Sequence, residues 1–502
     1  MTEAGASTPR TGTYGSPARV PTGIAGLDEI LGGGLFEGGV YIVQGTPGSG
    51  KTIFANQACF THAAERGARA LYVTLLAESH ARMLGHIAGL AFFDAGAIPD
   101  RLTYLSAFRT LQDEGLAGLL ALLRREAAER EADLLILDGV MAAEESADSA
   151  LEFKKFIHEL QTQAAASGTT VLLLTSASAG APMAAAEHTM VDGLIELSSR
   201  LHGRRAERDL EVRKFRGSGF LRGRHSFRIT DEGVVVHPRT EARFREPSRR
   251  DHVTGPAVSL GIPALDAMLG RGLPLHSTTL LVGPSGIGKT TLGLQFLGAG
   301  PGEPGLLVGF HESEAALTAK ARALGLPVAG AIADGAVSLM WQPATEGLID
   351  EICDRLLATV RNLGVRRVFI DGLDAMSRLT EDGDRIIRIV AALTAELRAL
   401  NVTSVVTMET DLTGLAAGQP LSGVSLRGAS AITENILVMR FVEQRSALHR
   451  MVSVIKARDS AIDQRLRCFA IRDGGIAVED GPERAEAILA ELQHLPLRRG
   501  GE

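Results

Sequence analysis

Short apolar runs alternate with longer amphipathic stretches along most of the chain. In the N-terminal half these runs are 40–43, YVTLL, LLILDG and VLLLTS, and polar or glycine-rich residues bound them. Continuously apolar runs of this length are typical of parallel strands that are covered on both faces. The pattern predicts an α/β fold in which helices flank a mostly parallel sheet.

The same succession of elements occurs twice. Thr22-Gly-Ile-Ala-Gly-Leu-Asp28 reappears as Leu260-Gly-Ile-Pro-Ala-Leu-Asp266, and each copy leads into an apolar strand, a glycine-rich loop and a helix. The lysines that end the two loops are 238 residues apart (289 − 51), and the aspartates that end the third strands are 233 apart (371 − 138). Internal similarity at a nearly constant offset indicates a duplicated domain.

These features divide the 502 residues into five parts. Residues 1–17 are expected to be a flexible tail, 18–238 and 257–480 two domains, and 481–502 a C-terminal helix and tail. Residues 239–256 are polar, are bounded and interrupted by prolines, and lack apolar periodicity, so they are predicted to be a linker.

Two glycine-rich loops carry the candidate chemistry. Each satisfies G-x-x-x-x-G-K-[ST] between a strand and a helix, where backbone N–H groups converge on phosphate oxygens. The lysines would neutralise the β- and γ-phosphates, and one threonine hydroxyl of each loop would bind Mg²⁺, so ATP and Mg²⁺ are the expected cofactors. The predicted ATP-binding residues are Gly45, Thr46, Pro47, Gly48, Ser49, Gly50, Lys51, Thr52, Gly283, Pro284, Ser285, Gly286, Ile287, Gly288, Lys289, Thr290 and Thr291, with Thr52 and Thr290 on the metal.

Acidic residues at strand ends complete the two candidate sites. Asp138 and Asp371 end the third strands, where a Walker-B carboxylate holds the metal, usually through water. A helix N-cap aspartate would look the same in sequence. Glu78 and Glu312 end the second strands, where an acid can deprotonate the attacking water or merely cap the next helix.

A basic stretch from Arg200 to Arg228 allows two interpretations. The simpler one is a solvated charged face. However, Lys214-Phe-Arg216, which follows a strand-like run, recurs as Lys456-Ala-Arg458 after another such run. A basic pair at the end of a late strand is suited to reach the γ-phosphate held by a neighbouring subunit, as an arginine finger does.

Composition restricts the class of partner. A net charge of −7 and an aromatic content of 4% argue against nucleic acid as a general partner, without excluding a local contact. Cys59, Cys353 and Cys468 lie too far apart for a four-ligand zinc site, and a reducing cytoplasm is the expected location. No apolar run reaches the ~20 residues that span a bilayer, so no membrane contact is expected.

Together these residues resemble the double-domain KaiC family, the bacterial RecA-like ATPases related to the circadian clock protein. The motifs TGIAGLDEILGGGL, both P-loops, YVTLLAESH, LLILDG, KFRGSGF and IKARDS carry the resemblance over about residues 18–480. It implies two tandem RecA-like P-loop domains in a two-tiered ring hexamer with nucleotide bound between subunits. Lys214, Arg216, Lys456 and Arg458 would then act in trans. Slow ATP hydrolysis and Ser/Thr autophosphorylation in the second domain are also implied.

The position of the catalytic base departs from the family's pattern. Two adjacent glutamates are usual there, and the first is generally taken as the base. Ala77 and His311 stand in that position here. Glu78 and Glu312 remain, and a neutral His311 is a further candidate base.

The phosphorylated Ser-Thr pair of the clock proteins also differs. It falls on Ser430 and Ala431, so Ser430 is the candidate phosphosite, with Thr433 nearby. We therefore do not expect an ordered two-site phosphorylation cycle. The short tail after 480 shows no match to the segment that binds the clock activator, so a circadian oscillator is not expected either.

The leading hypothesis is a slowly ATP-hydrolysing hexameric signalling protein whose nucleotide state sets the binding of unidentified protein partners. One alternative is a DNA-acting RecA or DnaB-type motor with the basic stretch lining a channel. Another is a nucleotide-binding scaffold without hydrolysis, motivated by Ala77 and His311.

Overall fold

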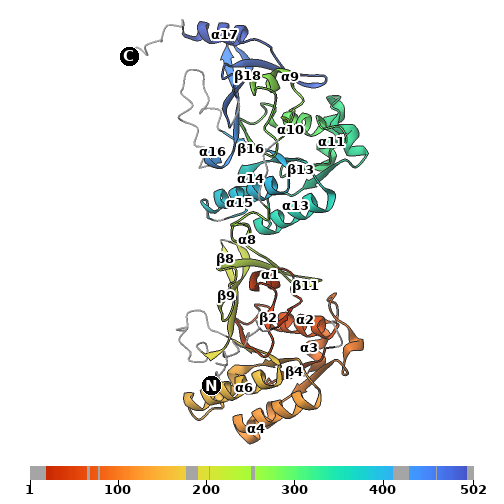
Figure 1. Ribbon diagram of the computed structural model, residues 1–502, viewed down its shortest axis with the longest axis vertical. Helices are drawn as coiled ribbons and strands as arrows, with labels where there is room; N and C mark the ends of the chain where they lie inside the picture. Colours follow the sequence, from red (N-terminus) through yellow and green to blue (C-terminus); the bar gives the residue numbers. More distant parts are fainter. Residues whose placement is uncertain are drawn as a thin grey trace, which may run out of the picture. The chain divides into compact units, whose positions relative to one another are not determined.

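The computed structural model describes residues 18–64, 68–76, 80–176, 190–202, 204–249, 255–380, 382–410, 429–458 and 461–493. They belong to two compact units, which divide the chain between Arg239 and Thr240. In each unit, helices lie on both faces of a twisted sheet (Figure 1).

The described strands of the first unit form a nine-stranded sheet in the order β11-β10-β9-β8-β3-β7-β6-β4-β5. From β8 to β5 neighbouring strands are parallel, and β9, β10 and β11 continue the sheet antiparallel. The strands are β3 (Val40–Gly45), β4 (Ala70–Thr74), β5 (Leu102–Ser106), β6 (Leu134–Asp138), β7 (Thr170–Thr175), β8 (Gly193–His202), β9 (Arg205–Phe215), β10 (Arg224–Thr230) and β11 (Gly233–His237), with a separate pair β1 (Arg19–Val20) and β2 (Leu35–Phe36). The helices are α1 (Leu27–Leu31), α2 (Lys51–Ala64), α3 (His80–Ile87), the 3-10 helix η1 (Ala95–Ala97), α4 (Phe108–Glu129), α5 (Val140–Glu145) and α6 (Ala150–Ser167).

The second unit repeats this architecture with nine described strands in the equivalent order β20-β19-β18-β17-β12-β16-β15-β13-β14. Its strands are β12 (Thr278–Gly283), β13 (Gly305–Gly309), β14 (Val337–Trp341), β15 (Arg367–Asp371), β16 (Thr403–Glu409), β17 (Asn435–Gln444), β18 (Ala447–Ala457), β19 (Arg467–Arg472) and β20 (Gly475–Val478). Its helices are α8 (Thr240–Arg243), α9 (Pro263–Met268), α10 (Lys289–Gly298), α11 (Glu314–Ala323), α12 (Val328–Ala333), α13 (Ile349–Leu363), α14 (Leu373–Ser377), α15 (Arg385–Ala399), α16 (Ala429–Ile432) and α17 (Glu483–Gln493). The predicted fold, two mostly parallel sheets flanked by helices, is confirmed.

The central strands are apolar on both faces because each face carries its own core. In β3, Tyr41 and Val43 belong to one buried cluster, while Val40 and Ile42 belong to a second. Successive side chains of a strand point to opposite faces, so the two clusters lie on the two sides of the sheet. Covering both faces is what makes the apolar runs continuous in the sequence.

The repeated motif that begins each domain closes a turn before the first helix. Asp28 Oδ1 accepts hydrogen bonds from the backbone N–H of Thr22 at 2.8 Å and from its hydroxyl at 2.7 Å. In the second copy Asp266 accepts from the backbone N–H of Leu260 at 2.8 Å and from the hydroxyl of Ser259 at 2.6 Å. A hydroxyl one residue earlier thus replaces the threonine that the second copy lacks.

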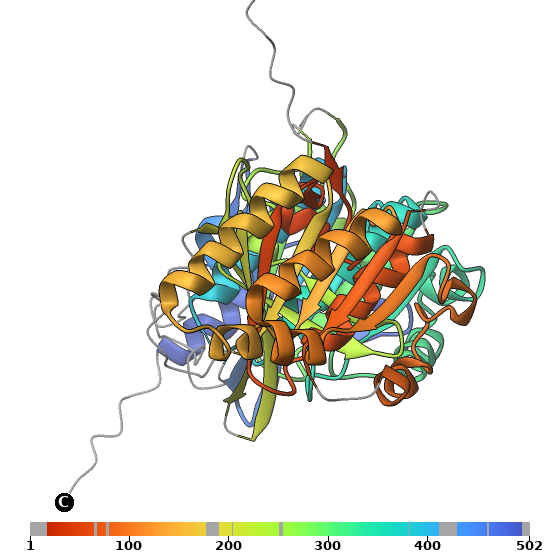
Figure 2. The same ribbon diagram turned by 90° about the horizontal axis from the view of Figure 1, so that it is seen from below.

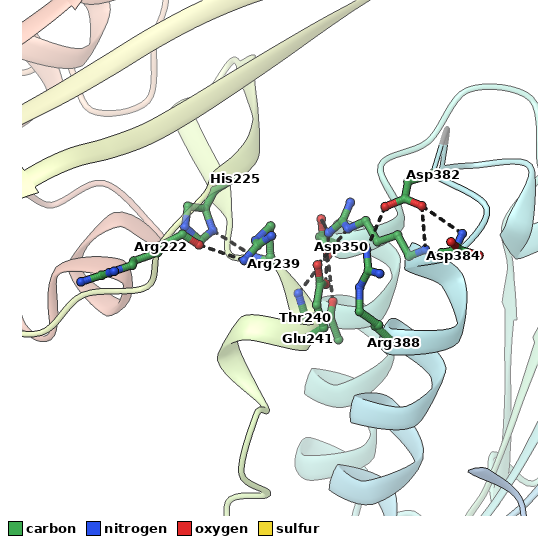
Figure 3. A network of polar contacts seen from close by, with 10 residues as sticks. Arg222, His225, Arg239, Thr240, Glu241, Asp350, Asp382, Asp384 and Arg388 are labelled. Carbon is green, nitrogen blue, oxygen red and sulfur yellow. Dashed lines mark hydrogen bonds and ion pairs between the residues drawn. The ribbon is translucent and has the colours of Figure 1, made fainter. Parts of the chain in front are cut away.

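Part of the predicted linker is packed against the second unit. Thr240 donates its backbone N–H and its hydroxyl to Asp350 Oδ1 of α13, each at 3.0 Å, and Glu241 pairs with Arg385 of α15 (Figure 3). Phe244 is 7% exposed and joins the core of this unit. The linker is therefore shorter than 239–256, because residues 240–248 have tertiary partners that a polar composition does not reveal. Residues 250–254 lie outside the described part.

Within the residues that the structure describes, no helix is both long and apolar enough to cross a membrane. The helix predicted near the C-terminus is present as α17, where Ala485 and Ile488 are buried. Residues 1–17 and 494–502 lie outside the described residues.

Candidate functional site

Each P-loop connects the central strand of its sheet to a helix. β3 ends at Gly45 and α2 begins at Lys51, while β12 ends at Gly283 and α10 begins at Lys289. The apolar pattern predicts helices from Ile53 and Leu292, but each helix begins two or three residues earlier, at its P-loop lysine, since the lysine and threonines of the motif form the first turn. The N–H groups of that turn have no helical acceptor, which makes each helix start suitable for binding anions.

The loop glycines serve two different needs. Gly48 and Gly286 have φ of 79° and 74°, and a Cβ on either would meet no atom within 4 Å, so the backbone conformation is what requires glycine there. A Cβ on Gly45 would instead lie 2.4 Å from the carbonyl oxygen of Leu197 and 2.5 Å from Ser49 Oγ. Crowding therefore requires glycine at the strand end.

The P-loop lysines are held by the loops themselves. Lys51 Nζ donates to the carbonyl oxygens of Gly45 at 2.7 Å and Thr46 at 3.2 Å. Lys289 Nζ donates to those of Gly283 at 2.7 Å and Pro284 at 2.9 Å. Burial lowers the pKa of both ammonium groups, and nearby carboxylates partly oppose this shift. The ammonium group of each lysine therefore lies at its P-loop, where a bound phosphate would be a stronger hydrogen-bond partner than the carbonyl oxygens.

In the second unit the P-loop opens into a cavity of about 370 Å³. Asp371 accepts hydrogen bonds there from two hydroxyls, Thr290 Oγ1 to Oδ2 at 2.7 Å and Thr407 Oγ1 to Oδ1 at 2.8 Å. The cavity is lined by Ser285, Gly286, Gly288, Lys289, Thr290, Thr291, His311, Glu312, Lys320, Asp371, Gly372, Asp374, Thr407, Glu409 and Ile471. The structure therefore brings the predicted P-loop, Walker-B and base residues of this domain into one site.

The two base candidates of the second unit lie side by side in this cavity. Glu312 and His311 follow the end of β13, and Ser313 after them caps α11 by accepting from the N–H of Ala316. The Glu312 carboxylate forms an ion pair with Lys320 of α11. A Cβ on Gly372, next to Asp371, would lie 3.4 Å from His311 Nε2. Lys320 was not predicted, because a lysine on a helix face looks like a solvated charge in sequence.

In the first unit the Walker-B aspartate is held from a different strand. Asp138 Oδ2 accepts a hydrogen bond at 2.7 Å from the hydroxyl of Tyr72, a fully buried residue of β4. By strand register, Tyr72 of the first unit is equivalent to Leu307 of the second, and Thr407 of the second unit is equivalent to Leu174 of the first. Each aspartate therefore receives a neighbouring-strand hydroxyl, from β4 in one domain and from β16 in the other.

A second phenol continues this polar cluster to the P-loop helix. The hydroxyl of Tyr104 donates to Asn56 Oδ1 at 2.7 Å, and Asn56 Nδ2 donates to the carbonyl oxygen of Thr52 at 2.8 Å. The rings of Tyr72 and Tyr104 lie 5.3 Å apart. The equivalent positions of the second unit are leucines: Leu294, Leu307 and Leu339. Ala77 and Glu78 of the first site lie outside the described residues.

An arginine also reaches the first P-loop. Arg208 of β9 lines a cavity of about 470 Å³ together with Gly48, Gly50, Lys51 and Thr52. Gly45 pairs with Leu197, and Leu197 pairs with Leu210 of β9. Arg208 is two residues from Leu210 along β9, so it lies just past the level of Gly45. Sequence reasoning included Arg208 only as one member of the basic stretch, since strand register decides which arginine meets the loop.

The predicted basic pairs lie at the other end of the sheets. Arg216 N–H donates to the Asp192 carbonyl, and Asp192 N–H donates to that of Val40, so Arg216 is level with the start of β3. In the second unit, Arg458 N–H donates to the Glu434 carbonyl and Glu434 N–H donates to that of Thr278, so Arg458 is level with Thr278. Five residues of strand, about 17 Å, separate these levels from Gly45 and Gly283.

The lysines of the pairs are one step closer to the loops but still distant. Lys214 pairs with Leu194, which is level with Ile42, and burial lowers its pKa, with Arg216 adding to the effect. Lys456 Nζ donates to the carbonyl oxygens of Ser430 at 2.9 Å and Thr433 at 2.7 Å. The pairs are therefore not part of the site formed by their own chain's P-loop.

The donor set of each site fits a magnesium nucleotide. In the second site the Asp371 carboxylate and the Thr290 hydroxyl lie beside the loop N–H groups, which is the arrangement in which Mg²⁺ is bound jointly by protein oxygens, water and phosphate. No cluster of three or more His, Cys, Asp or Glu side chains suited to a metal occurs in the described part of the chain. A metal would thus be held together with the phosphates.

Comparison with known proteins agrees with this geometry. A family model described as "ATPase: KaiC" matches residues 20–241 and again residues 258–483. The chain is 28% identical over 493 residues to the circadian clock oscillator protein KaiC of Picosynechococcus sp., covering 94% of this chain and 92% of that protein. It is 26% identical over 511 residues to the protein of the same name from Synechococcus elongatus, covering 98% and 95%. The chain belongs to the KaiC family of ATPases, as a double-domain member distantly related to the circadian proteins over nearly its full length.

Proposed function

We propose that this protein is a hexameric, ATP-binding signalling protein that hydrolyses ATP slowly at sites formed between subunits, and that its nucleotide state sets the binding of partner proteins. The observation that supports this most directly is the position of the basic pairs. Arg216 and Arg458 lie about 17 Å along the strands from their own P-loops. They can contribute to hydrolysis only at a nucleotide held by another subunit.

Each site then has residues in distinct roles. The loop N–H groups and Lys51 or Lys289 hold the phosphates, and Thr52 with Asp138, or Thr290 with Asp371, hold Mg²⁺. Bound Mg²⁺ would supply neutralisation of the phosphate charge. Glu78 and Glu312 are the proposed bases, while Lys320 orients Glu312 through their ion pair.

Native mass and phosphate release test the proposal together. The wild type should form a hexamer when ATP is added and should release phosphate slowly. Lys51→Ala and Lys289→Ala should each remove turnover at one site, because the phosphates lose their buried cation. A protein that stays monomeric with ATP, or whose turnover survives both substitutions together, would overturn the proposal.

Autophosphorylation of Ser430 is a second candidate activity, supported by one contact. Lys456 Nζ donates to the carbonyl oxygen of Ser430 itself, so the proposed trans-acting lysine and the candidate phosphosite form one hydrogen-bonded unit. A neighbouring subunit's γ-phosphate that meets Lys456 would therefore lie near this serine. Incubation with radiolabelled ATP should label the wild type and not Ser430→Ala, and equal labelling of the two would reject the site.

The DNA-motor alternative gains no support from the basic stretch. Four arginines of this stretch are engaged in ion pairs with carboxylates of the sheet, namely Arg200, Arg205, Arg213 and Arg224. Charges neutralised in this way contribute little to phosphate binding. Single-stranded DNA binding at two salt concentrations is the direct check, and a steep salt dependence would revive the alternative.

A further inference from the structure

The groove between α4 and α6 in the first unit has a counterpart in the second unit. Helices α4 and α13 both precede the strand that ends in the Walker-B aspartate, and α6 and α15 both follow it. The offset of 233 residues from Asp138 to Asp371 also aligns buried helix residues of the two domains, for example Leu119 with Ile352. Figure 2 shows α4 and α6 side by side on the near face of the first unit. The two grooves are therefore equivalent places in the repeated fold.

In the second unit the groove is filled by residues 240–248. Beyond the Thr240 and Glu241 contacts, Arg243 Nη1 pairs with an Asp354 oxygen at 2.6 Å, and the N–H of Ser248 donates to Glu396 at 2.7 Å. The Arg361 guanidinium lies 5.7 Å from the centre of the Phe244 ring. The residues that receive this segment are Asp350, Asp354, Arg361 and Glu396 on α13 and α15, together with Arg385.

In the first unit the counterparts of four of these residues line an open groove of about 1250 Å³. At the offset of 233 they are Ala117, Ala121, Ala128 and Gln163. The three alanines are exposed and the glutamine is half-buried, whereas Asp350 and Glu396 are both 0% exposed beneath their segment. The first domain thus has the shape of the receiving groove without its charged anchors.

The sequence contains a counterpart of the filling segment at the required distance. At the offset of 238 that relates the P-loop lysines, residues 2–10 (TEAGASTPR) align without a gap on residues 240–248 (TEARFREPS). Thr, Glu, Ala and Pro are identical, at four of the nine positions. Both segments precede the repeated turn motif by the same number of residues, so the first has the same length of chain with which to reach its groove.

We propose that residues 2–10 dock in the α4–α6 groove of their own domain, as residues 240–248 do in the α13–α15 groove. The charged contacts of the second domain are missing here, because Ala117, Ala121 and Gln163 replace the three carboxylates and Glu152 stands where Arg385 would pair with the glutamate. Ala6 also replaces the aromatic anchor Phe244. The docked state is consequently weaker than in the second domain and exchanges readily.

Thiol labelling of a cysteine placed in the groove tests this docking. The three natural cysteines are buried, so Ala121→Cys supplies the reporting thiol. Its maleimide reaction in the full chain should be slower by about threefold or more than in a chain that lacks residues 2–10, since only the undocked state reacts. Ala91→Cys, exposed and outside the groove, should react equally in both chains.

A second experiment introduces two of the missing charged anchors into the first groove. Ala117→Asp with Glu152→Arg gives the first groove the pair that binds Thr240 and Glu241, and should slow labelling further in the full chain but not in the truncated one. Equal rates in the two chains overturn the proposal, including the case in which another copy of the chain covers the groove in both. A slowing by the double substitution that persists without residues 2–10 would equally overturn it.

Discussion

At the scale of single residues, the two nucleotide sites differ most in how the Walker-B carboxylate is fixed. Tyr72 donates to Asp138, whereas Thr290 and Thr407 donate to Asp371. A buried acceptor that loses such a partner costs about 1–3 kcal/mol. The Tyr72 and Thr407 hydroxyls therefore position the carboxylates that would hold the metal, whereas the Thr290 hydroxyl is itself a proposed metal ligand.

Removing the Tyr72 hydroxyl should weaken metal binding at the first site. In a Lys289→Ala background, Tyr72→Phe should raise the Mg²⁺ concentration needed for half-maximal phosphate release by about tenfold, because one charge-assisted bond is lost. Tyr104→Phe is the matched control, since its hydroxyl bonds Asn56 and not Asp138. Identical Mg²⁺ curves for wild type and Tyr72→Phe would show that the phenol is only structural.

The base of the second site can be assigned in the same manner. In a Lys51→Ala background, Glu312→Gln should lower turnover by about 10²-fold or more, as expected for loss of a general base. His311→Gln should have a much smaller effect, because we assign the proton transfer to the carboxylate that Lys320 orients. Single-turnover phosphate release measures both, and the reverse order of effects would make His311 the base.

These residues also mark the limit of what the sequence could predict. The P-loops, Asp138 and Asp371 follow local patterns, and the structure places them where the patterns indicated. Tyr72, Thr407 and Arg208 could not be assigned, because strand register brings them to the site from other strands. Lys320 could not be assigned either, because only the facing of α11 directs it to Glu312. Aligning the two copies position by position would have singled out Tyr72, because the second copy has Leu307 there and a buried tyrosine hydroxyl needs a hydrogen-bond partner.

At the scale of elements, the segment after the first domain behaves as part of the second. Helix α8 contacts both α13 and α15, and the Asp350 carboxylate beneath it is fully buried. Burial raises the pKa of Asp350, and Arg385 opposes that shift. Polar composition made this segment look like a linker, because its partners are charges that lie more than 100 residues away.

Breaking this network should destabilise the second unit. Asp350→Ala leaves the Arg385 guanidinium without one partner and should lower the free energy of unfolding by about 3–5 kcal/mol. Asp354→Ala, which removes a partly exposed pair with Arg243, should cost less than about 1 kcal/mol. Urea unfolding followed by the fluorescence of Trp341, the single tryptophan, reports on this unit. Equal midpoints for Asp350→Ala and wild type would contradict the role given to the network.

At the scale of the whole molecule, duplication has preserved architecture more strictly than chemistry. Both sheets have the same strand order, the same antiparallel extension and the same register break before the basic pair. The hydroxyl partners, the base position and the charged groove anchors have all diverged between the copies. We therefore expect the two P-loops of each chain to serve ATP sites with unequal catalysis.

Mixing two inactive variants tests most directly whether the sites form between subunits. One variant carries Lys51→Ala with Lys289→Ala, and the other carries Arg216→Ala with Arg458→Ala. Each alone should release almost no phosphate. Equal mixtures should recover activity at roughly a quarter of the interfaces, where an intact P-loop meets an intact basic pair. A mixture as inactive as its components, or an arginine variant as active as wild type, would contradict catalysis in trans.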